Sequence, residues 1–238
     1  MEKLKGKKIV IAGATGSIGE QTTKQLLASG ADVFLLAKDA NRLGELVAEL
    51  QLPSNRAFQV DITNGEHLQE VAKVINEEII APDVLINAVG IGIIKPFEQL
   101  SFEEFDKSIS VNLYGAFHLL KSFLPAMKEQ KKGLIINIPG VLGKTPMAGA
   151  TAYSASKYGL NGMMKSLREE LKRTDIRITQ LFLGGVDSRF WDTIDLRVQR
   201  DKMIMAEEAA KAIWFLCQQP SSGVVSEMVI QPFNHQVI

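Results

Sequence analysis

The chain has 238 residues, enough for a large hydrophobic core, and its 27 lysines and arginines balance its 27 aspartates and glutamates. A formal net charge of zero excludes the electrostatic footprint expected of a protein that binds nucleic acid or an anionic membrane. One cysteine excludes a disulfide framework, and the apolar run AIWFLC that ends at Cys217 indicates a buried thiol rather than a reactive one.

The N-terminal segment MEKLKGKKIVIAG begins with charged residues and then has an apolar stretch of only about five residues. That stretch is too short for the hydrophobic region of a signal peptide or for a membrane span. We therefore expect a cytoplasmic protein that has no membrane partner.

Apolar runs of strand length alternate along the chain with longer stretches of helical period. The runs are continuous rather than alternating with polar residues, which is typical of strands covered on both faces. Strict alternation of strand and helix favours a doubly wound parallel sheet with right-handed crossovers. We expect one Rossmann-type α/β/α domain over residues 1–238, because no linker or repeat interrupts the pattern. Strands are expected at 8–13, 32–37, 57–60, 83–88, 133–138, 177–183 and 227–232, and helices near 17–29, 40–50, 65–79, 101–129, 152–173 and 206–218.

The first predicted strand is followed by VIAGATGSIGE (10–20), a glycine-rich turn that leads into a helix. Glycine permits a tight turn there and lets backbone N–H groups and the positive helix end approach a pyrophosphate. An ordinary glycine-rich turn is the alternative, but its place after the first strand favours a dinucleotide site. The cofactor-binding residues expected in this turn are Gly13, Thr15, Gly16, Ser17, Ile18 and Gly19.

The second predicted strand ends in LLAKDANRL (35–43). An enzyme that uses NAD typically has a carboxylate near this end for the ribose 2′-OH, whereas a 2′-phosphate requires a cation instead. Ala37 and Lys38 therefore favour NADP(H) as the cofactor over NAD(H). Lys38 is equally explained as a solvated surface lysine, so NAD(H) stays open as the second choice.

Tyr153 and Lys157 lie four residues apart in a predicted helix and therefore project from one face of it. An ammonium group close to a phenol is expected to lower the phenol pKa from about 10 toward the working pH. Tyr153 would then donate a proton to a substrate carbonyl oxygen while a nicotinamide passes hydride to the carbon, and would accept the proton in reverse. A tyrosine and a lysine four residues apart on a helix are usually ordinary surface residues. The catalytic interpretation therefore depends on the preceding strand, the glycine turn and Asn112.

The order and spacing of six segments make the chain resemble the compact, single-domain short-chain dehydrogenases/reductases over nearly its whole length. These segments are the glycine turn, Asp61 in QVDIT, NAVG (87–90), Asn112 in VNLYGAF, YSASK (153–157) and LGGVDS (183–188). The resemblance implies that Asn112 holds a proton-relay water and that Lys157 binds the nicotinamide ribose. It also implies a homodimer or homotetramer in which helices 101–129 and 152–173 pair between subunits.

The same resemblance implies a set of cofactor contacts beyond the glycine turn. Asp61 would contact the adenine, residues 87–90 would support the cofactor, and the segment after the sixth strand would lie against the nicotinamide. Without the resemblance, Asp61 is interpreted as a capping or turn residue and NAVG as a strand terminus. The full set is Ala37, Lys38, Asp61, Ile62, Asn87, Ala88, Val89, Gly90, Tyr153, Lys157, Val186 and Ser188.

Gly140 stands thirteen residues before Tyr153, where the resemblance implies a serine that donates to the substrate oxygen. Loss of such a donor costs on the order of 10²- to 10³-fold in rate, which weakens activity without abolishing it. Water, Thr145 or Thr151 are candidates to replace the donor. The glycine turn also departs from the compact pattern at Ala12 and Ser17, and Leu183 stands where the family usually has proline.

His67, His118 and His235 are scattered without ligand spacing, so no metal site is expected. Between the sixth strand and the last helix lies the segment where this fold carries its substrate lid. Four large side chains there either line an apolar pocket or simply pack: Phe190, Trp191, Met203 and Met205.

Two functions compete on the sequence. The first is an NADP-dependent carbonyl reductase or alcohol dehydrogenase acting on a small carbonyl or alcohol substrate, with Tyr153, Lys157 and Asn112 in the roles above. The second is a protein that binds NAD(P)(H) but has lost efficient catalysis and acts as a cofactor sensor or structural partner. The retained side chains favour the first function, and Gly140 favours the second.

Overall fold

Seven parallel strands form the central sheet of the computed structural model, which describes residues 3–234. The strand order is β3-β2-β1-β4-β5-β6-β9, so the direction of winding reverses between β1 and β4. This arrangement confirms the predicted doubly wound α/β fold. The strands are β1 (Lys8–Ala12), β2 (Asp32–Ala37), β3 (Ala57–Gln59), β4 (Val84–Asn87), β5 (Lys132–Asn137), β6 (Asp175–Leu183) and β9 (Glu227–Ile230).

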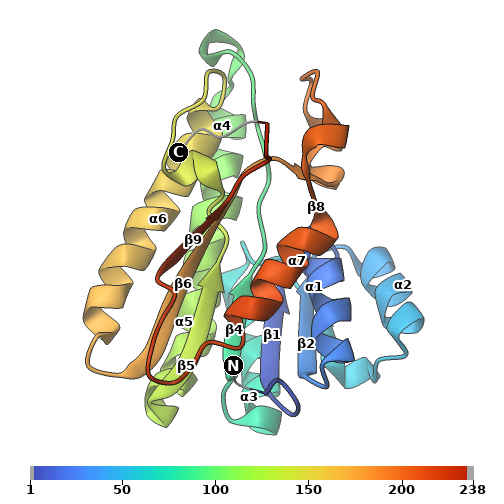
Figure 1. The fold of residues 1–238 in the computed structure, drawn as a ribbon, viewed down its shortest axis with the longest axis vertical. Coiled ribbons are helices and arrows are strands. Elements are labelled where there is room, and N and C mark those ends of the chain that lie inside the picture. The colour runs from blue at the N-terminus through green and yellow to red at the C-terminus, as the bar shows by residue number, and fades with distance from the viewer. Residues whose placement is uncertain (1–2, 235–238) are drawn as a thin grey trace.

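Helices cover both faces of the sheet, as Figure 1 shows. One face packs on α1 (Ser17–Ala28), α2 (Ala40–Leu50) and α7 (Ala206–Leu216), and the other on α3 (Gly65–Ile79), α5 (Gly115–Gln130) and α6 (Thr151–Leu171). Side chains alternate between the faces, so Val10 enters one core while its neighbours Ile9 and Ile11 enter the other. Both faces are therefore apolar, which explains the continuous runs in the sequence.

The single helix expected over 101–129 is interrupted in the structure. It consists of α4 (Phe102–Ile109), a π-helical turn (Ser110–Tyr114) and α5. Ser101 and Glu104 form a capping box that begins α4, because each side chain bonds the other residue's backbone N–H. The extra residue of a π turn bulges the helix, and such bulges are frequent at functional sites. Asn112 lies in this turn.

Short elements complete the described chain. The strands β7 (Val186–Asp187) and β8 (Ile204–Met205) pair in parallel, and they bracket the segment predicted to be a lid. No helix within residues 3–234 is both long and apolar enough to cross a bilayer. Single 3₁₀ turns lie at Ser54–Arg56, Phe97–Gln99, Val141–Gly143, Arg189–Thr193 and Arg200–Lys202.

Candidate active site

Most of the predicted site residues follow the carboxyl ends of adjacent strands, from β3 through β2, β1, β4 and β5 to β6, and the loops after β1, β4, β5 and β6 form the centre of the site. In this register Ala12 pairs with Asn87, Asn87 with Asn137, and Asn137 with Gln180. The loops that leave these strand ends therefore emerge side by side. A parallel sheet binds its ligand at such an edge, next to the point where the strand order reverses.

The glycine turn after β1 has the close approaches that only glycine allows. Gly13 has a φ of 83°, and a Cβ atom there would lie 2.9 Å from the carbonyl carbon of Ala88. A Cβ atom at Gly19 would lie 2.1 Å from the carbonyl oxygen of Gly13. Gly16 is the N-cap of α1, and no side chain of the described residues caps it. The N–H groups of the first helical turn are therefore available to an anion such as a pyrophosphate.

Arg189 joins the lid to this turn, a relationship that sequence reasoning missed. Its backbone N–H donates to Ser17 Oγ over 3.1 Å, and its guanidinium donates to the carbonyl oxygen of Thr15. The same guanidinium lies 3.3 Å from a carboxylate oxygen of Glu20. The residues in contact lie more than 160 positions apart, so no local pattern signals the contact. It brings a cation to the entrance of the glycine turn.

Lys38 and Asp61, both predicted to contact the cofactor, form an ion pair of 2.7 Å at the ends of β2 and β3. The Lys38 side chain is 78% exposed, as a surface lysine would be. Asp61 also accepts from the backbone N–H and the hydroxyl of Thr63, which makes it a turn residue as well. Burial opposes ionisation of Asp61, but the bonds from Lys38 and Thr63 outweigh it and hold its pKa below the usual value. Ala37 and Ile62 beside this pair are buried.

The segment after β4 is shaped by the Asn87 side chain, which is 5% exposed. Its Nδ2 donates to Asn137 Oδ1 over 2.9 Å, and its Oδ1 accepts from the N–H of Val89. Asn87 therefore fixes the direction of the turn that leads to Gly90. Asn137 is a positioning residue that sequence reasoning missed, and its own Nδ2 is buried without a partner in residues 3–234.

Asn112 ties the π turn to the loop after β4. Its Oδ1 accepts from the N–H of Ile91 over 2.9 Å, and its Nδ2 donates to the carbonyl oxygen of Ile91 over 3.0 Å and to Ser156 Oγ over 2.9 Å. Ser156 in turn belongs to α6, the helix that carries Tyr153 and Lys157. The side chain of Asn112 therefore connects three parts of the candidate site.

Tyr153 and Lys157 lie together at the start of α6, as their spacing predicts. The Lys157 Nζ lies 5.6 Å from the centre of the Tyr153 ring and 3.4 Å from the carbonyl oxygen of Ile138. A Cβ atom at Gly90 would lie 2.9 Å from this ammonium, so a larger residue at 90 would displace it. The Tyr153 ring lines the pocket, whereas Lys157 is buried behind it.

The pKa of Tyr153 shifts in the direction opposite to the one expected from its lysine. Burial raises the pKa of the Tyr153 phenol, and burial also lowers the pKa of Lys157 to about 8. Tyr153 is only half-buried, because its side chain borders the pocket. In the free protein desolvation therefore outweighs the effect of the neighbouring ammonium, and Tyr153 stays protonated at neutral pH.

Gly140 lies where the serine was expected, but its backbone differs from that of an ordinary serine. Its φ of 71° and ψ of 165° belong to a region that is essentially restricted to glycine. A Cβ atom at Gly140 would lie 3.5 Å from the Tyr153 hydroxyl. Of the candidate replacement donors, Thr145 lines the pocket, whereas Thr151 is exposed and does not line it.

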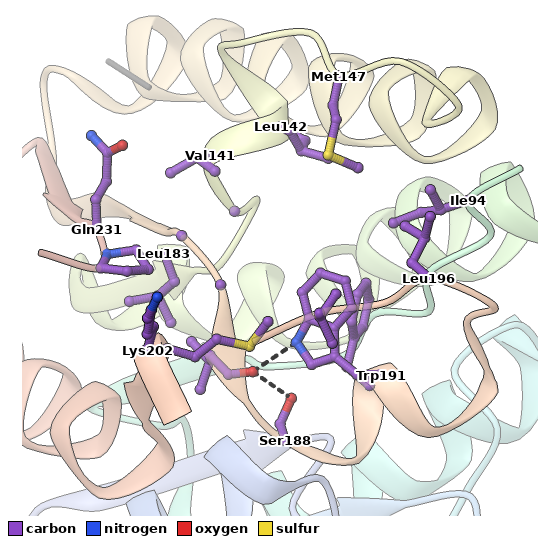
Figure 2. A pocket seen from close by; sticks show the side chains of 18 of the residues that line it. Ile94, Val141, Leu142, Met147, Leu183, Ser188, Trp191, Leu196, Lys202 and Gln231 are labelled. Atoms are coloured by element: carbon purple, nitrogen blue, oxygen red, sulfur yellow. Dashed lines mark hydrogen bonds between the residues drawn. The ribbon is translucent and has the colours of Figure 1, made fainter. Parts of the chain in front are cut away.

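A pocket of about 640 Å³ opens beside Tyr153 and Gly140. Three of the four predicted lid residues line it, and the fourth, Met205, is 58% exposed and lies outside it. The Phe190 ring packs on Tyr153 with 5.6 Å between ring centres. Figure 2 shows Trp191 and Ser188 both bonded to one backbone oxygen, that of Val186, over 2.9 and 3.2 Å. The lid therefore packs directly against the predicted nicotinamide end.

Other chemistry finds little support in the described chain. No cluster of three histidine, cysteine, aspartate or glutamate side chains suited to a metal occurs within residues 3–234. His67 and His118 lie in separate helices, and His235 lies outside the described residues. Cys217 is buried, and burial raises its pKa to about 12, so the thiol is unreactive as expected.

Comparisons with solved structures agree with this geometry. An alcohol dehydrogenase from the archaeon Thermococcus sibiricus, complexed with 5-hydroxy-NADP, is 26% identical with a TM-score of 0.87, and the match covers 98% of this chain and 100% of that one. Serine dehydrogenase from Escherichia coli is 25% identical with a TM-score of 0.86, covering 97% and 100%. A metagenomic short-chain oxidoreductase in complex with NADP is 30% identical with a TM-score of 0.82, covering 97% and 99%.

Sequence comparisons give the same answer. An uncharacterized oxidoreductase of Staphylococcus epidermidis is 30% identical over 232 residues, which cover 98% of this chain and 100% of the relative. A counterpart in Staphylococcus aureus is 28% identical with the same coverage. The family model described as short chain dehydrogenase matches residues 7–198. The chain therefore belongs to the short-chain dehydrogenase/reductase family.

Proposed function

We propose that the protein is an NADP(H)-dependent oxidoreductase that transfers hydride between the nicotinamide and the carbonyl or alcohol carbon of a small substrate. One observation carries this proposal: Tyr153 lines an apolar pocket at the strand ends, while Lys157 is buried behind it and Asn112 ties their helix to the loop after β4. The bound cofactor would supply or accept the hydride, and the protein residues handle the proton.

Tyr153 acts as the general acid during reduction. Burial keeps its phenol protonated, which is the state needed to protonate a carbonyl oxygen. The phenol O–H bond breaks as the O–H bond of the product alcohol forms. Below pH about 8 the Lys157 ammonium stabilises the phenolate that remains, and in the reverse direction the phenolate takes the alcohol proton.

The residues present fit a dinucleotide. The glycine turn and the uncapped start of α1 would hold the pyrophosphate, and Val186 and Ser188 would contact the nicotinamide end. Asn87 and Gly90 would shape the floor beneath the cofactor, and Asp61 and Ile62 would border the adenine. The complete proposed set is the one predicted from the sequence, with Arg189 added.

Three observations support NADP(H) over NAD(H). Lys38 lies at the end of β2 and Arg189 lies at the glycine turn, and a cofactor phosphate would be attracted to both cations. Asp39, the carboxylate nearest in sequence, accepts from the N–H of Arg42 as the N-cap of α2 and so is already engaged. Two of the similar structures were solved with NADP or its 5-hydroxy derivative.

The alternative function is a protein that binds NAD(P)(H) with little or no catalysis. Gly140 favours it, because this position supplies no hydroxyl to the substrate oxygen. Oxidation of NADPH against a broad panel of ketones, aldehydes and diketones, together with a cofactor titration, separates the two functions. Turnover above background supports the enzyme, and tight cofactor binding without turnover on any compound supports the alternative.

We also propose a homo-oligomer formed through α4, α5 and α6. Large apolar side chains are exposed on these helices, and exposed apolar patches mark association surfaces. Light scattering at micromolar concentration tests the proposal, and a monomer would contradict it. A cytoplasmic location stays a prediction. The exposed side chains are Phe102, Phe105, Tyr114, Phe117 and Tyr158.

A further inference from the structure

The lid segment between Ser188 and Met205 contains four cations, and they fall into two pairs that behave differently. Arg189 pairs with Glu20, and Arg200 pairs with Asp187 and with an oxygen of Asp192 2.7 Å away. These two arginines do not line the pocket. Both guanidinium groups have carboxylate partners, and these ion pairs help to hold the lid in place.

The other two cations, Arg197 and Lys202, both line the pocket. Within residues 3–234 neither side chain makes a hydrogen bond or an ion pair. No aspartate or glutamate of the described chain lines the pocket either. The pocket thus carries two exposed positive charges, and neither has an ion-pair partner among the described residues. Such a site attracts an anion.

Most of the remaining pocket wall is apolar. Figure 2 shows Lys202 and Gln231 on one side of the cavity, with Ile94 and Leu196 on the opposite side. Leucine, isoleucine, valine, methionine, proline and aromatic side chains make up most of the remaining lining. A ligand that fills this space therefore has an apolar body and one polar end.

Resting on the proposed function, we propose that the substrate is an apolar oxo acid, or the matching hydroxy acid, whose carboxylate is attracted into the pocket by the positive charges of Lys202 and Arg197. Its carbonyl oxygen faces Tyr153, and its apolar body contacts the wall formed by Ile94, Trp191 and Leu196. A carboxylate beside two unpaired cations gains charge-assisted hydrogen bonds that a neutral analogue cannot make. The lid thus selects substrates by charge as well as by shape.

The test compares acids with neutral compounds of the same shape on the NADPH-loaded protein. Phenyl-substituted oxo acids of increasing chain length are assayed beside their primary amides. We expect kcat/KM to favour the best acid over its amide by about 10-fold or more, and the ratio to fall as salt is added. Lys202→Gln and Arg197→Gln should each reduce the ratio, and together abolish it. Lys211→Gln, which removes an exposed charge outside the pocket, is the control and should leave the ratio unchanged.

Thermal melting of the NADP⁺-loaded protein gives a readout that needs no turnover. Phenylalkanoates should raise Tm more than phenylalkanamides, and Lys202→Gln should remove the difference. Equal kcat/KM for acids and amides would overturn the charge proposal while leaving the reductase intact. The charge proposal would also be overturned if both variants bound NADPH more weakly while the acid-to-amide ratio of kcat/KM stayed unchanged, because the two cations would then bind the cofactor rather than the substrate. If no compound is reduced, the proposed function fails, and acid-specific stabilisation alone decides the charge proposal.

Discussion

A Cβ atom at Gly140 would lie 3.5 Å from the hydroxyl oxygen of Tyr153, so position 140 and the proposed general acid share one corner of the pocket. The resemblance predicts a serine at this position, and here the backbone has a φ of 71°, which favours glycine. Position 140 therefore lacks the hydroxyl and has a conformation that serine rarely adopts.

Gly140→Ser should destabilise the protein by about 1–3 kcal/mol, because serine rarely adopts this backbone conformation. Gly140→Ala carries the same strain without the hydroxyl and is the matched control. The melting temperature should fall by a similar amount in both variants. If the serine Oγ reaches the substrate oxygen, kcat of the serine variant should exceed that of the alanine variant by about 10-fold. Equal kcat values would show that position 140 has no donor role, and unchanged melting would show that the loop adapts without strain.

Lys157→Met should stabilise the cofactor-free protein at pH 7 while removing activity. The Lys157 pKa is lowered from 10.5 to about 8, so the unfolded chain binds more protons than the folded protein between these values. The free energy of unfolding of the parent protein therefore rises between pH 8 and pH 10.5. Below pH 8 Lys157 is charged in both states, and the folded protein bears the full cost of burying that charge. We expect a difference of about 3 kcal/mol at pH 7 that shrinks toward pH 10.5. Denaturant unfolding at several pH values measures it, and a difference that does not depend on pH would contradict the buried charge.

Lys38→Ala should weaken NADPH binding by about 10-fold and leave NADH binding nearly unchanged. The substitution removes a cation and also releases the Asp61 carboxylate, which then repels a 2′-phosphate. Nucleotide fluorescence titration measures both affinities, with Lys211→Ala as the control. Adding Ala37→Asp should shift the cofactor preference further toward NAD. Ala37 is only 4% exposed, so a carboxylate there can also destabilise the fold, and the melting temperature is measured in parallel. If the double variant bound NADPH as tightly as the parent does, other residues would determine the cofactor preference.

Asn112→Ala should destabilise the fold by at least about 2 kcal/mol and reduce kcat. Its amide satisfies both backbone groups of Ile91, and these would be left without their partner at a partly buried position. Ser110→Ala, in the same π turn, removes a hydroxyl with no hydrogen bond among the described residues and is the control. If the two variants had similar melting temperatures, the side chain of Asn112 would not be needed for the stability of the π turn.

The parts of the fold that follow from local pattern were predictable. Strands such as Asp32–Ala37 are continuous apolar runs, and the glycine turn stands between a strand and a helix, so both are visible in the sequence. The π turn at Asn112 was not visible, because helical periodicity continues through it and the hydrogen bonds of Asn112 join it to Ile91, 21 residues away in the sequence.

Properties that depend on burial or on distant contacts were missed or mistaken. The sequence pairs Tyr153 with Lys157 but does not reveal that Lys157 is buried and Tyr153 half-buried, and this burial reverses the expected direction of the Tyr153 pKa shift. Arg189 reaches Thr15 only because the lid folds back over the glycine turn. The positive φ of Gly140 likewise depends on the loop path, which a missing serine alone does not specify.

The role of Tyr153 is tested most directly by Tyr153→Phe, assayed by NADPH oxidation with an accepted ketone and by NADPH titration on the same preparation. Removal of one hydroxyl leaves the ring and its packing on Phe190 in place, so cofactor affinity should stay close to that of the parent. Loss of the proton donor should lower kcat by about 10²- to 10⁴-fold. A Tyr153→Phe variant that reduces the ketone at the parental kcat would show that another group supplies the proton.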